Sequence, residues 1–205
     1  RNNASCAVTI YKIDLSNDAT NRTLDIDGSG TTTVTNTISN GVSSAASKLS
    51  YSGTGKLILQ GTNTYDGTTA VTSGTLTIQN GSALGSATNG TTISNGATLE
   101  LEHATGMTIS GETLTLSGTG VSANGALNNV SGSNTWTGNI GLAANTKIQS
   151  DAGLLTISGD IARSGGTNRA VVFDGSGDIT VSGAIAGTVT TLTKNGSGVL
   201  TLSNA

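Results

Sequence analysis

The feature that most constrains this fold is a pair of apolar residues, two positions apart, that recurs along most of the chain. These pairs are Leu24/Ile26, Leu57/Leu59, Leu76/Ile78, Leu99/Leu101, Leu114/Leu116, Leu155/Ile157, Ile179/Val181 and Leu200/Leu202. Residues two apart lie on the same side of a β-strand, whereas one side of a helix repeats every three or four residues. No segment sustains the helical spacing. The chain is therefore predicted to be all-β and built from many short strands.

A longer internal repeat contains these pairs. Residues 21–30 align without a gap with residues 168–177, at an offset of 147, and residues 53–61 align with residues 196–204, at an offset of 143. Such self-similarity is typical of solenoids, in which each unit buries its apolar face against the next. We predict that residues 21–205 form a solenoid with about 1.3 copies of a repeat of roughly 145 residues. Residues 1–20 are predicted to be an N-terminal cap or a strand donated to a neighbour.

Asn-Gly steps separate many of these strands and turn the chain, because both residues tolerate positive φ. Strands joined in this way would also suit the hairpins of an antiparallel sandwich. Two observations favour a parallel β-helix, or β-solenoid, instead. Many strands are separated by a single sharp corner, and similar units follow one another along the chain. With roughly 20–25 residues per coil, we expect about nine coils spaced about 4.8 Å apart.

Composition supports a narrow core and a weakly charged surface. Aromatic residues make up 2% of the chain and charged residues 10%. The residue between the members of an apolar pair is usually threonine, which suits an outward-facing ladder: Thr77, Thr115, Thr156, Thr180 and Thr201. The net charge is −3 and the basic residues are scattered, which argues against a nucleic-acid partner. No apolar run reaches the roughly 18 residues of a membrane-spanning helix, so no membrane insertion of this segment is expected.

Charged candidates for catalysis are few. A β-helical polysaccharide lyase or hydrolase would need carboxylates, and often a basic residue, on one outward face. The candidates for such a face are Glu100, Glu102, Glu112, Asp174 and Asp178. A solvated charged face is the favoured interpretation, because no basic residue lies near them in the sequence. His103, the only histidine, is predicted to be a solvated residue at a corner.

Three further features each have a structural and a functional interpretation. Residues 27–30 and 174–177 share the sequence Asp-Gly-Ser-Gly, for which a tight turn is favoured over a calcium loop. Tyr65 and Trp136 occupy equivalent positions in an Asn-Thr-aromatic-x-Gly motif, where packing at a corner is favoured over stacking on a sugar. Cys6, the only cysteine, is interpreted as an incidental thiol, with an intermolecular bridge as the alternative.

The threonine rows raise one further alternative, binding to ice, although Asp25, Ile58 and Glu100 interrupt the rows. Taken together, the residues predict no catalytic, cofactor-binding or metal-binding site, and no cofactor.

Residues 53–78 closely resemble the passenger-associated repeat of autotransporters, which reads G-x-G-x-L-x-L-x-G-x-N-T-Y-x-G-x-T-x-V and then G-T-L. Residues 81–85, 96–99, 133–138 and 151–157 are also similar to this family, so the resemblance runs from about Leu24 to the end. It implies a right-handed parallel β-helix that is displayed on, or released from, a Gram-negative outer membrane. It carries over no catalytic residues.

The predicted function is therefore structural: a secreted or cell-surface β-helical stalk or fibre, not an enzyme. The predicted partner is a second copy of the chain, bound end to end by strand stacking, since an open strand edge is a template for another strand. The alternative is that these residues are a window of a longer repetitive passenger. An adhesin that binds a host-cell or glycan surface is the second function considered, and a polysaccharide lyase or hydrolase is the third.

Overall fold

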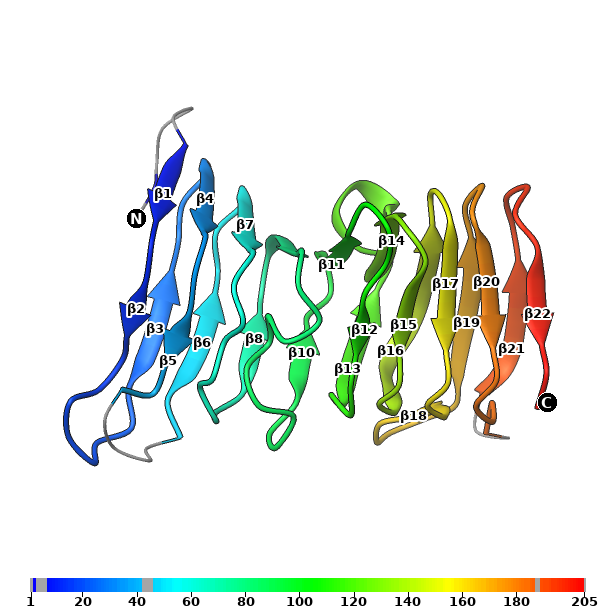
Figure 1. Ribbon diagram of the computed structural model, residues 1–205. Helices are drawn as coiled ribbons and strands as arrows, with labels where there is room; N and C mark the ends of the chain where they lie inside the picture. Colours follow the sequence, from blue (N-terminus) through cyan, green and yellow to red (C-terminus); the bar gives the residue numbers. More distant parts are fainter. Residues whose placement is uncertain (1, 3–6, 42–45, 187–188, 205) are drawn as a thin grey trace.

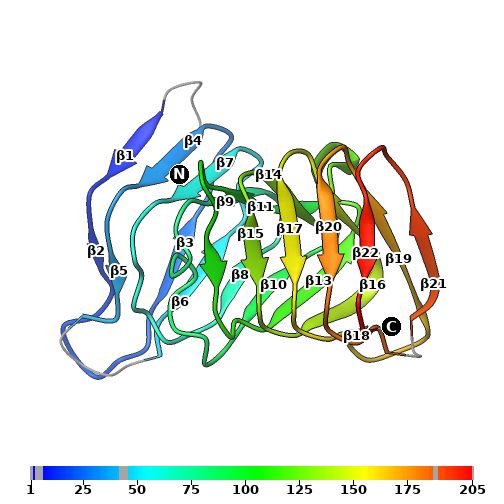
Figure 2. The same ribbon diagram turned by 45° about the vertical axis from the view of Figure 1, so that its right-hand side comes forward.

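The computed structural model describes residues 2, 7–41, 46–186 and 189–204. Short strands follow one another around a common axis, and each coil of the chain stacks against the previous one (Figures 1 and 2). Pairings between strands are parallel throughout, as between β7 and β9, β15 and β17, or β3 and β6. This confirms the parallel β-solenoid and rules out the antiparallel sandwich. Within the described residues, no helix has the length and hydropathy needed to cross a bilayer.

The strands form three faces, which we number in the order in which the chain visits them. Face 1 consists of β1 (Val8–Ile10), β4 (Thr31–Val34), β7 (Lys56–Leu59), β9 (Gly74–Ile78), β11 (Ala97–Glu102), β14 (Leu127–Ser131), the second half of β16 (Ile140–Ser150), β19 (Arg169–Asp174) and β21 (Val189–Lys194). Face 2 consists of β2 (Ile13–Asp14), β5 (Ile38–Ser39), β12 (Thr108–Ile109), β15 (Asn134–Trp136), β17 (Leu154–Ile157), β20 (Asp178–Val181) and β22 (Leu200–Leu202). Face 3 consists of β3 (Thr23–Ile26), β6 (Lys48–Tyr51), β8 (Thr69–Val71), β10 (Thr91–Ile93), β13 (Leu114–Gly118), the first half of β16 and β18 (Ile161–Arg163).

The coils differ in length but keep the strands in register. Lys56 pairs with Thr75, a coil of 19 residues, whereas Leu99 pairs with Leu127, a coil of 28 residues. The longest coil places its extra residues in the corner between β13 and β14, which holds the single-turn 3-10 helix Val121–Ala123. Differences in length are therefore absorbed largely by corners. The described chain makes about eight turns, close to the nine predicted.

The core is a set of stacked apolar rows. On face 1 the inward positions pair in register from coil to coil, and each of these side chains is fully buried: Leu57, Leu76, Leu99, Leu127, Ile148 and Phe173. Burial of such a side chain stabilises the fold by roughly 1.5–3 kcal/mol. The core also holds four of the five aromatic side chains in the sequence, Tyr51, Tyr65, Trp136 and Phe173. A narrow core thus accommodates these few rings and leaves only Tyr11 outside.

The long sequence repeat does not return to the same face. Leu24 lies in β3 on face 3, but its equivalent, Val171, lies in β19 on face 1. Leu57 lies in β7 on face 1, but its equivalent, Leu200, lies in β22 on face 2. In both comparisons, the second strand lies six coils and one further face along the chain from the first. Equivalent strands of the two long-repeat copies therefore lie on different faces of the solenoid. The unit that stacks in register is the single coil.

The predicted threonine ladders are outward-facing with one exception. Thr115, Thr156 and Thr180 are half-buried between neighbouring strands, and Thr201 is exposed. Thr77, however, is fully buried, and its hydroxyl donates a 2.7 Å hydrogen bond to the Glu100 carboxylate on the next coil. The prediction of an exposed side chain is wrong at this position because long charged neighbours on face 1 fold over the threonine.

Candidate functional site

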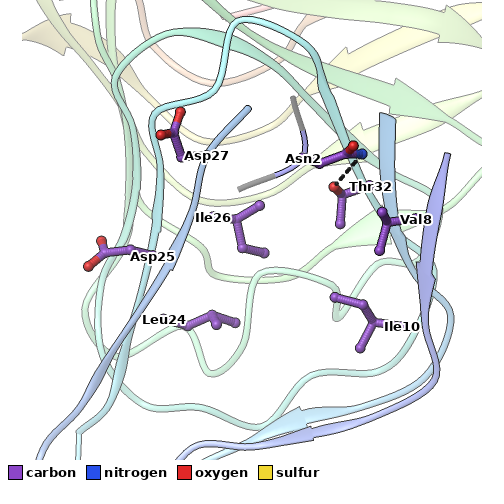
Figure 3. Close-up of a pocket in the computed structure, with 8 residues that line it drawn as sticks. All are labelled: Asn2, Val8, Ile10, Leu24, Asp25, Ile26, Asp27 and Thr32. Carbon is purple, nitrogen blue, oxygen red and sulfur yellow. Dashed lines mark hydrogen bonds between the residues drawn. The ribbon is translucent and has the colours of Figure 1, made fainter. Parts of the chain in front are cut away.

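The N-terminal end of the solenoid is an open section through its core. Figure 3 shows Ile10, Leu24 and Ile26 turned towards the interior, with Asp25 pointing away from it. These residues line a cavity of about 210 Å³ together with Asn2, Val8, Asp27 and Thr32. The Asn2 amide donates to the Thr31 carbonyl at 3.0 Å and to the Thr32 hydroxyl at 3.4 Å. The inward apolar rows that are sealed in the middle of the rod are therefore only partly covered here.

The C-terminal end exposes the other side of the stack. β21 and β22 form the last described coil, and their apolar residues Leu192 and Leu202 are 39% and 38% exposed. Val199, which precedes β22, is 61% exposed. The remaining exposed large apolar side chains among the described residues are Val8 and Tyr11, in the first coil. Among the described residues, exposed apolar surface of this kind is thus confined to the two end coils.

The Asn-Thr-aromatic motif forms a buried connection between coils. The Asn63 side-chain oxygen accepts a 2.7 Å hydrogen bond from the Ile38 N–H of the preceding coil, and its amide donates to the Ala83 carbonyl of the following coil. Asn134, at the equivalent position, accepts a 2.8 Å hydrogen bond from the Met107 N–H. Both asparagines are at least 97% buried. The shared motif is visible in the sequence, but this role of the asparagine was not predicted; the only signal for it is a polar asparagine at an otherwise apolar corner.

The aromatic residue of each motif points into the core. Tyr65 and Trp136 are fully buried, which confirms corner packing and contradicts stacking on a sugar. The Tyr65 hydroxyl lies 2.5 Å from the Thr69 hydroxyl, and burial is the main cause that raises the tyrosine's pKa well above its ordinary value. Within the part of the chain that the structure describes, the Trp136 indole N–H has no hydrogen-bond partner.

Glu112 is buried, contrary to the prediction of a solvated face. Its side chain is 3% exposed, and the Thr91 hydroxyl donates a 2.7 Å hydrogen bond to one carboxylate oxygen. Burial raises the pKa of Glu112, and the Thr91 hydrogen bond offsets this only in part. No local pattern in the sequence indicates this burial, because Thr91 lies 21 residues away and approaches only through stacking.

The other carboxylates do not join Glu112. Glu100 lies on face 1 and pairs with Lys56 at 2.7 Å, two coils away, so the structure supplies a basic partner that is remote in sequence. Glu102 follows on the same strand and is half-buried. His103 is also half-buried, rather than fully solvated, and its Nδ1 accepts a 3.0 Å hydrogen bond from the Gly106 N–H within a turn. Glu112, by contrast, precedes β13 on the way to face 3.

The Asp-Gly-Ser-Gly segments are turns at two different corners. Asp174 pairs with Lys147 at 2.6 Å, and hydrogen bonds from Lys147 and then from the Gly175 N–H lower its pKa. Asp178 accepts a 2.8 Å hydrogen bond from the Val199 N–H. Among the residues that the structure describes, no three His, Cys, Asp or Glu side chains are grouped as a metal ion would require. Cys6 lies outside the described residues.

Comparison with known families agrees with this architecture. The model of the passenger-associated-transport-repeat family matches residues 49–78 and 192–205. These segments contain β7 to β9 and β22, and the long repeat relates β7 to β22. No curated protein and no solved structure matches the chain significantly.

Proposed function

We propose that this chain, which carries the passenger-associated transport repeat of autotransporters, is a non-catalytic stalk whose end coils bind further solenoid coils end to end. The repeat itself implies a secreted or cell-surface location. The further coils that bind to each end belong to a second copy of the chain, and repeated binding of this kind gives extracellular filaments.

The observation that carries this proposal is the position of the exposed apolar side chains. Leu192, Val199 and Leu202 at one end, and Val8 and Tyr11 at the other, are the exposed large apolar residues of the described chain. Each end also presents strand edges, which accept a further parallel strand through backbone hydrogen bonds. An apolar section through a core, rimmed by open strand edges, fits another coil of the same kind.

The two ends are different surfaces, so contact between them is heterologous and does not close. Such a contact produces an open filament. The described rod has eight strand steps along face 1, which at about 4.8 Å per step gives an axial length of about 38 Å. Each contact between stacked chains adds one further step, so the filaments should show an axial repeat of about 43 Å.

Two end variants test the proposal by sedimentation velocity and negative-stain electron microscopy. Tyr11→Lys blocks the N-terminal end, and Leu192→Lys blocks the C-terminal end. Each variant alone should be monomeric at concentrations at which the parent chain forms filaments. An equimolar mixture should form one-to-one dimers. The intact C-terminal end of Tyr11→Lys binds the intact N-terminal end of Leu192→Lys, and both outer ends of this dimer are blocked.

Thr115→Lys, on face 3 in the middle of the rod, is the matched control and should leave the filaments unchanged. If the parent chain sediments as a monomer at every concentration, end-to-end assembly is contradicted. Equal filament formation by the end variants and the parent chain would equally contradict the assigned contact.

A further inference from the structure

The second half of face 2 carries a regular array of hydroxyl groups. Five triplets of the form Thr-x-Ser/Thr lie on successive coils: residues 108–110, 135–137, 156–158, 180–182 and 201–203. Their threonines pair in register from β12 through β15, β17 and β20 to β22. Figure 2 shows β15, β17, β20 and β22 side by side across the front of the solenoid. We call these ten outward residues the hydroxyl face: Thr108, Ser110, Thr135, Thr137, Thr156, Ser158, Thr180, Ser182, Thr201 and Ser203.

The hydroxyl face is repetitive in two directions. Neighbouring strands lie about 4.8 Å apart, and residues two apart on one strand lie about 6.6 Å apart. The five coils therefore place two parallel hydroxyl rows along about 19 Å of the rod. The strand pairings of face 2 contain no register shift, whereas the pairings of β11 with β14, β13 with β16 and β19 with β21 on the other faces do.

The outward positions of the other two faces are interrupted by charged or apolar residues. Face 1 carries the ion pairs Lys56–Glu100 and Lys147–Asp174. The outward row on face 3 runs through Asp25, Ser50, Ala70, Thr92, Thr115, Gly141 and Ala162. The residues that interrupt the threonine pattern in the sequence, Asp25, Ile58 and Glu100, thus lie on faces 3 and 1. The ten positions of the hydroxyl face are uninterrupted, and the exposed Asp178, two residues before Thr180 on the outward side of β20, borders them.

The hydroxyl groups are held in place but remain available. Among the described residues, no protein acceptor or donor bonds the hydroxyls of Thr108, Thr135, Thr156, Thr180 or Thr201. In the second row, the Thr137, Ser158 and Ser203 hydroxyls donate long hydrogen bonds of 3.3–3.5 Å to carbonyls of the preceding strand. The Thr137 hydroxyl also accepts a 2.8 Å hydrogen bond from the Gly111 N–H, whereas the acceptor lone pairs of Ser158 and Ser203 have no protein donor among the described residues. Threonine is stiff about χ1, so a packed row has few alternative arrangements.

From this geometry we propose that the hydroxyl face binds ordered water, with the surface of ice as its ligand. The spacing between strands is close to an oxygen repeat of the ice lattice, so successive threonine hydroxyls and methyl groups along a row meet nearly equivalent lattice positions. A crystalline glycan is disfavoured, because sugar rings are usually held on aromatic side chains and Trp136 points into the core below this face. The proposal is independent of filament assembly, because it concerns the side of the rod.

The test is thermal hysteresis and inhibition of ice recrystallisation by the purified chain, with binding of fluorescently labelled chain to a single ice crystal. The parent chain should facet ice crystals and accumulate on their surface. Thr156→Tyr, at the centre of the array, should abolish both effects, because a bulky ring lifts an ice plane off the neighbouring hydroxyls. Thr115→Tyr is the matched control: it changes an equally half-buried outward threonine on face 3 and should retain full activity.

Circular dichroism and melting temperature verify that both variants are folded. Absence of ice shaping by the parent chain at millimolar concentration would overturn the proposal, as would equal losses in Thr156→Tyr and Thr115→Tyr. Binding to crystalline cellulose or chitin that is lost in Thr156→Tyr, without ice shaping, would assign the face to a glycan and would also overturn it. So would a side-by-side dimer that Thr156→Tyr dissociates.

Discussion

Replacing Asn63 with alanine removes a side chain that connects three consecutive coils. Its oxygen accepts the Ile38 N–H at 2.7 Å and its amide donates to the Ala83 carbonyl. Ile38 and Ala83 are both fully buried, so water does not readily replace the lost partners. A buried polar group left without a partner costs roughly 1–3 kcal/mol. Two such groups give an expected loss of about 2–6 kcal/mol in the free energy of unfolding.

Urea unfolding, followed by circular dichroism, measures this loss, and hydrogen exchange of the Ile38 amide reports its location. Asn63→Asp sharpens the test, because aspartate keeps the acceptor but turns a negative oxygen towards the Ala83 carbonyl. We expect Asn63→Asp to be at least as unstable as Asn63→Ala at pH 7. It should recover partly at acid pH, where the protonated carboxyl donates a hydrogen bond again.

Asn195→Ala is the control, since this asparagine is exposed and its side chain makes no hydrogen bond within the described structure. Surface substitutions of this kind stay within about 0.5 kcal/mol of the parent. A loss in Asn63→Ala as small as that of the control, with unchanged exchange at Ile38, would refute the reasoning.

Three further changes have defined outcomes. Glu112→Gln should raise the melting temperature at pH 8. Because burial raises the pKa of Glu112, ionisation of this carboxyl costs more in the folded state than in the unfolded state, so stability falls as pH rises above the ordinary glutamate pKa. Glu102→Gln should leave this dependence intact. Lys147→Met should lower the free energy of unfolding at pH 7 by up to about 1 kcal/mol. It should also reduce the loss of stability in acid. The depressed pKa of Asp174 stabilises the fold above the pKa of the unfolded state, and this stabilisation disappears as pH falls through the pKa of the folded state. Gly159→Ala should destabilise by about 1–3 kcal/mol in urea unfolding, because its Cβ would lie 2.0 Å from the Gly138 carbonyl oxygen, whereas Ser158→Ala should be nearly neutral.

Strand positions were predictable because the evidence for a strand is local. The pairs Leu57/Leu59 and Leu155/Ile157 lie in β7 and β17, and their period of two needs no knowledge of neighbours. Parallel stacking followed from the repeat, and a corner position for Tyr65 followed from its motif. These inferences depend on residues close together in the sequence.

The face on which each strand lies, and the contacts between coils that follow from it, were not predictable from the sequence. Coil length varies from 19 to 28 residues, so the sequence does not state which face a given strand joins. The rotation of the long repeat by one face, the pairing of Lys56 with Glu100 and the burial of Glu112 by Thr91 all arise from that stacking. The Thr-x-Ser/Thr triplets are visible in the sequence, but only the register places five of them on one face.

The central claim, parallel coils with a repeat that moves on by one face, is tested most directly by disulfide cross-linking. In a Cys6→Ser background, cysteines at Thr180 and Thr201 lie opposite each other on face 2, at the strand spacing of about 4.8 Å that a disulfide spans. We predict rapid intramolecular cross-linking of Thr180→Cys/Thr201→Cys under native conditions. The pair Asp174→Cys/Thr201→Cys, which joins face 1 to face 2, should not cross-link. Cross-linking of the second pair but not the first would contradict the account.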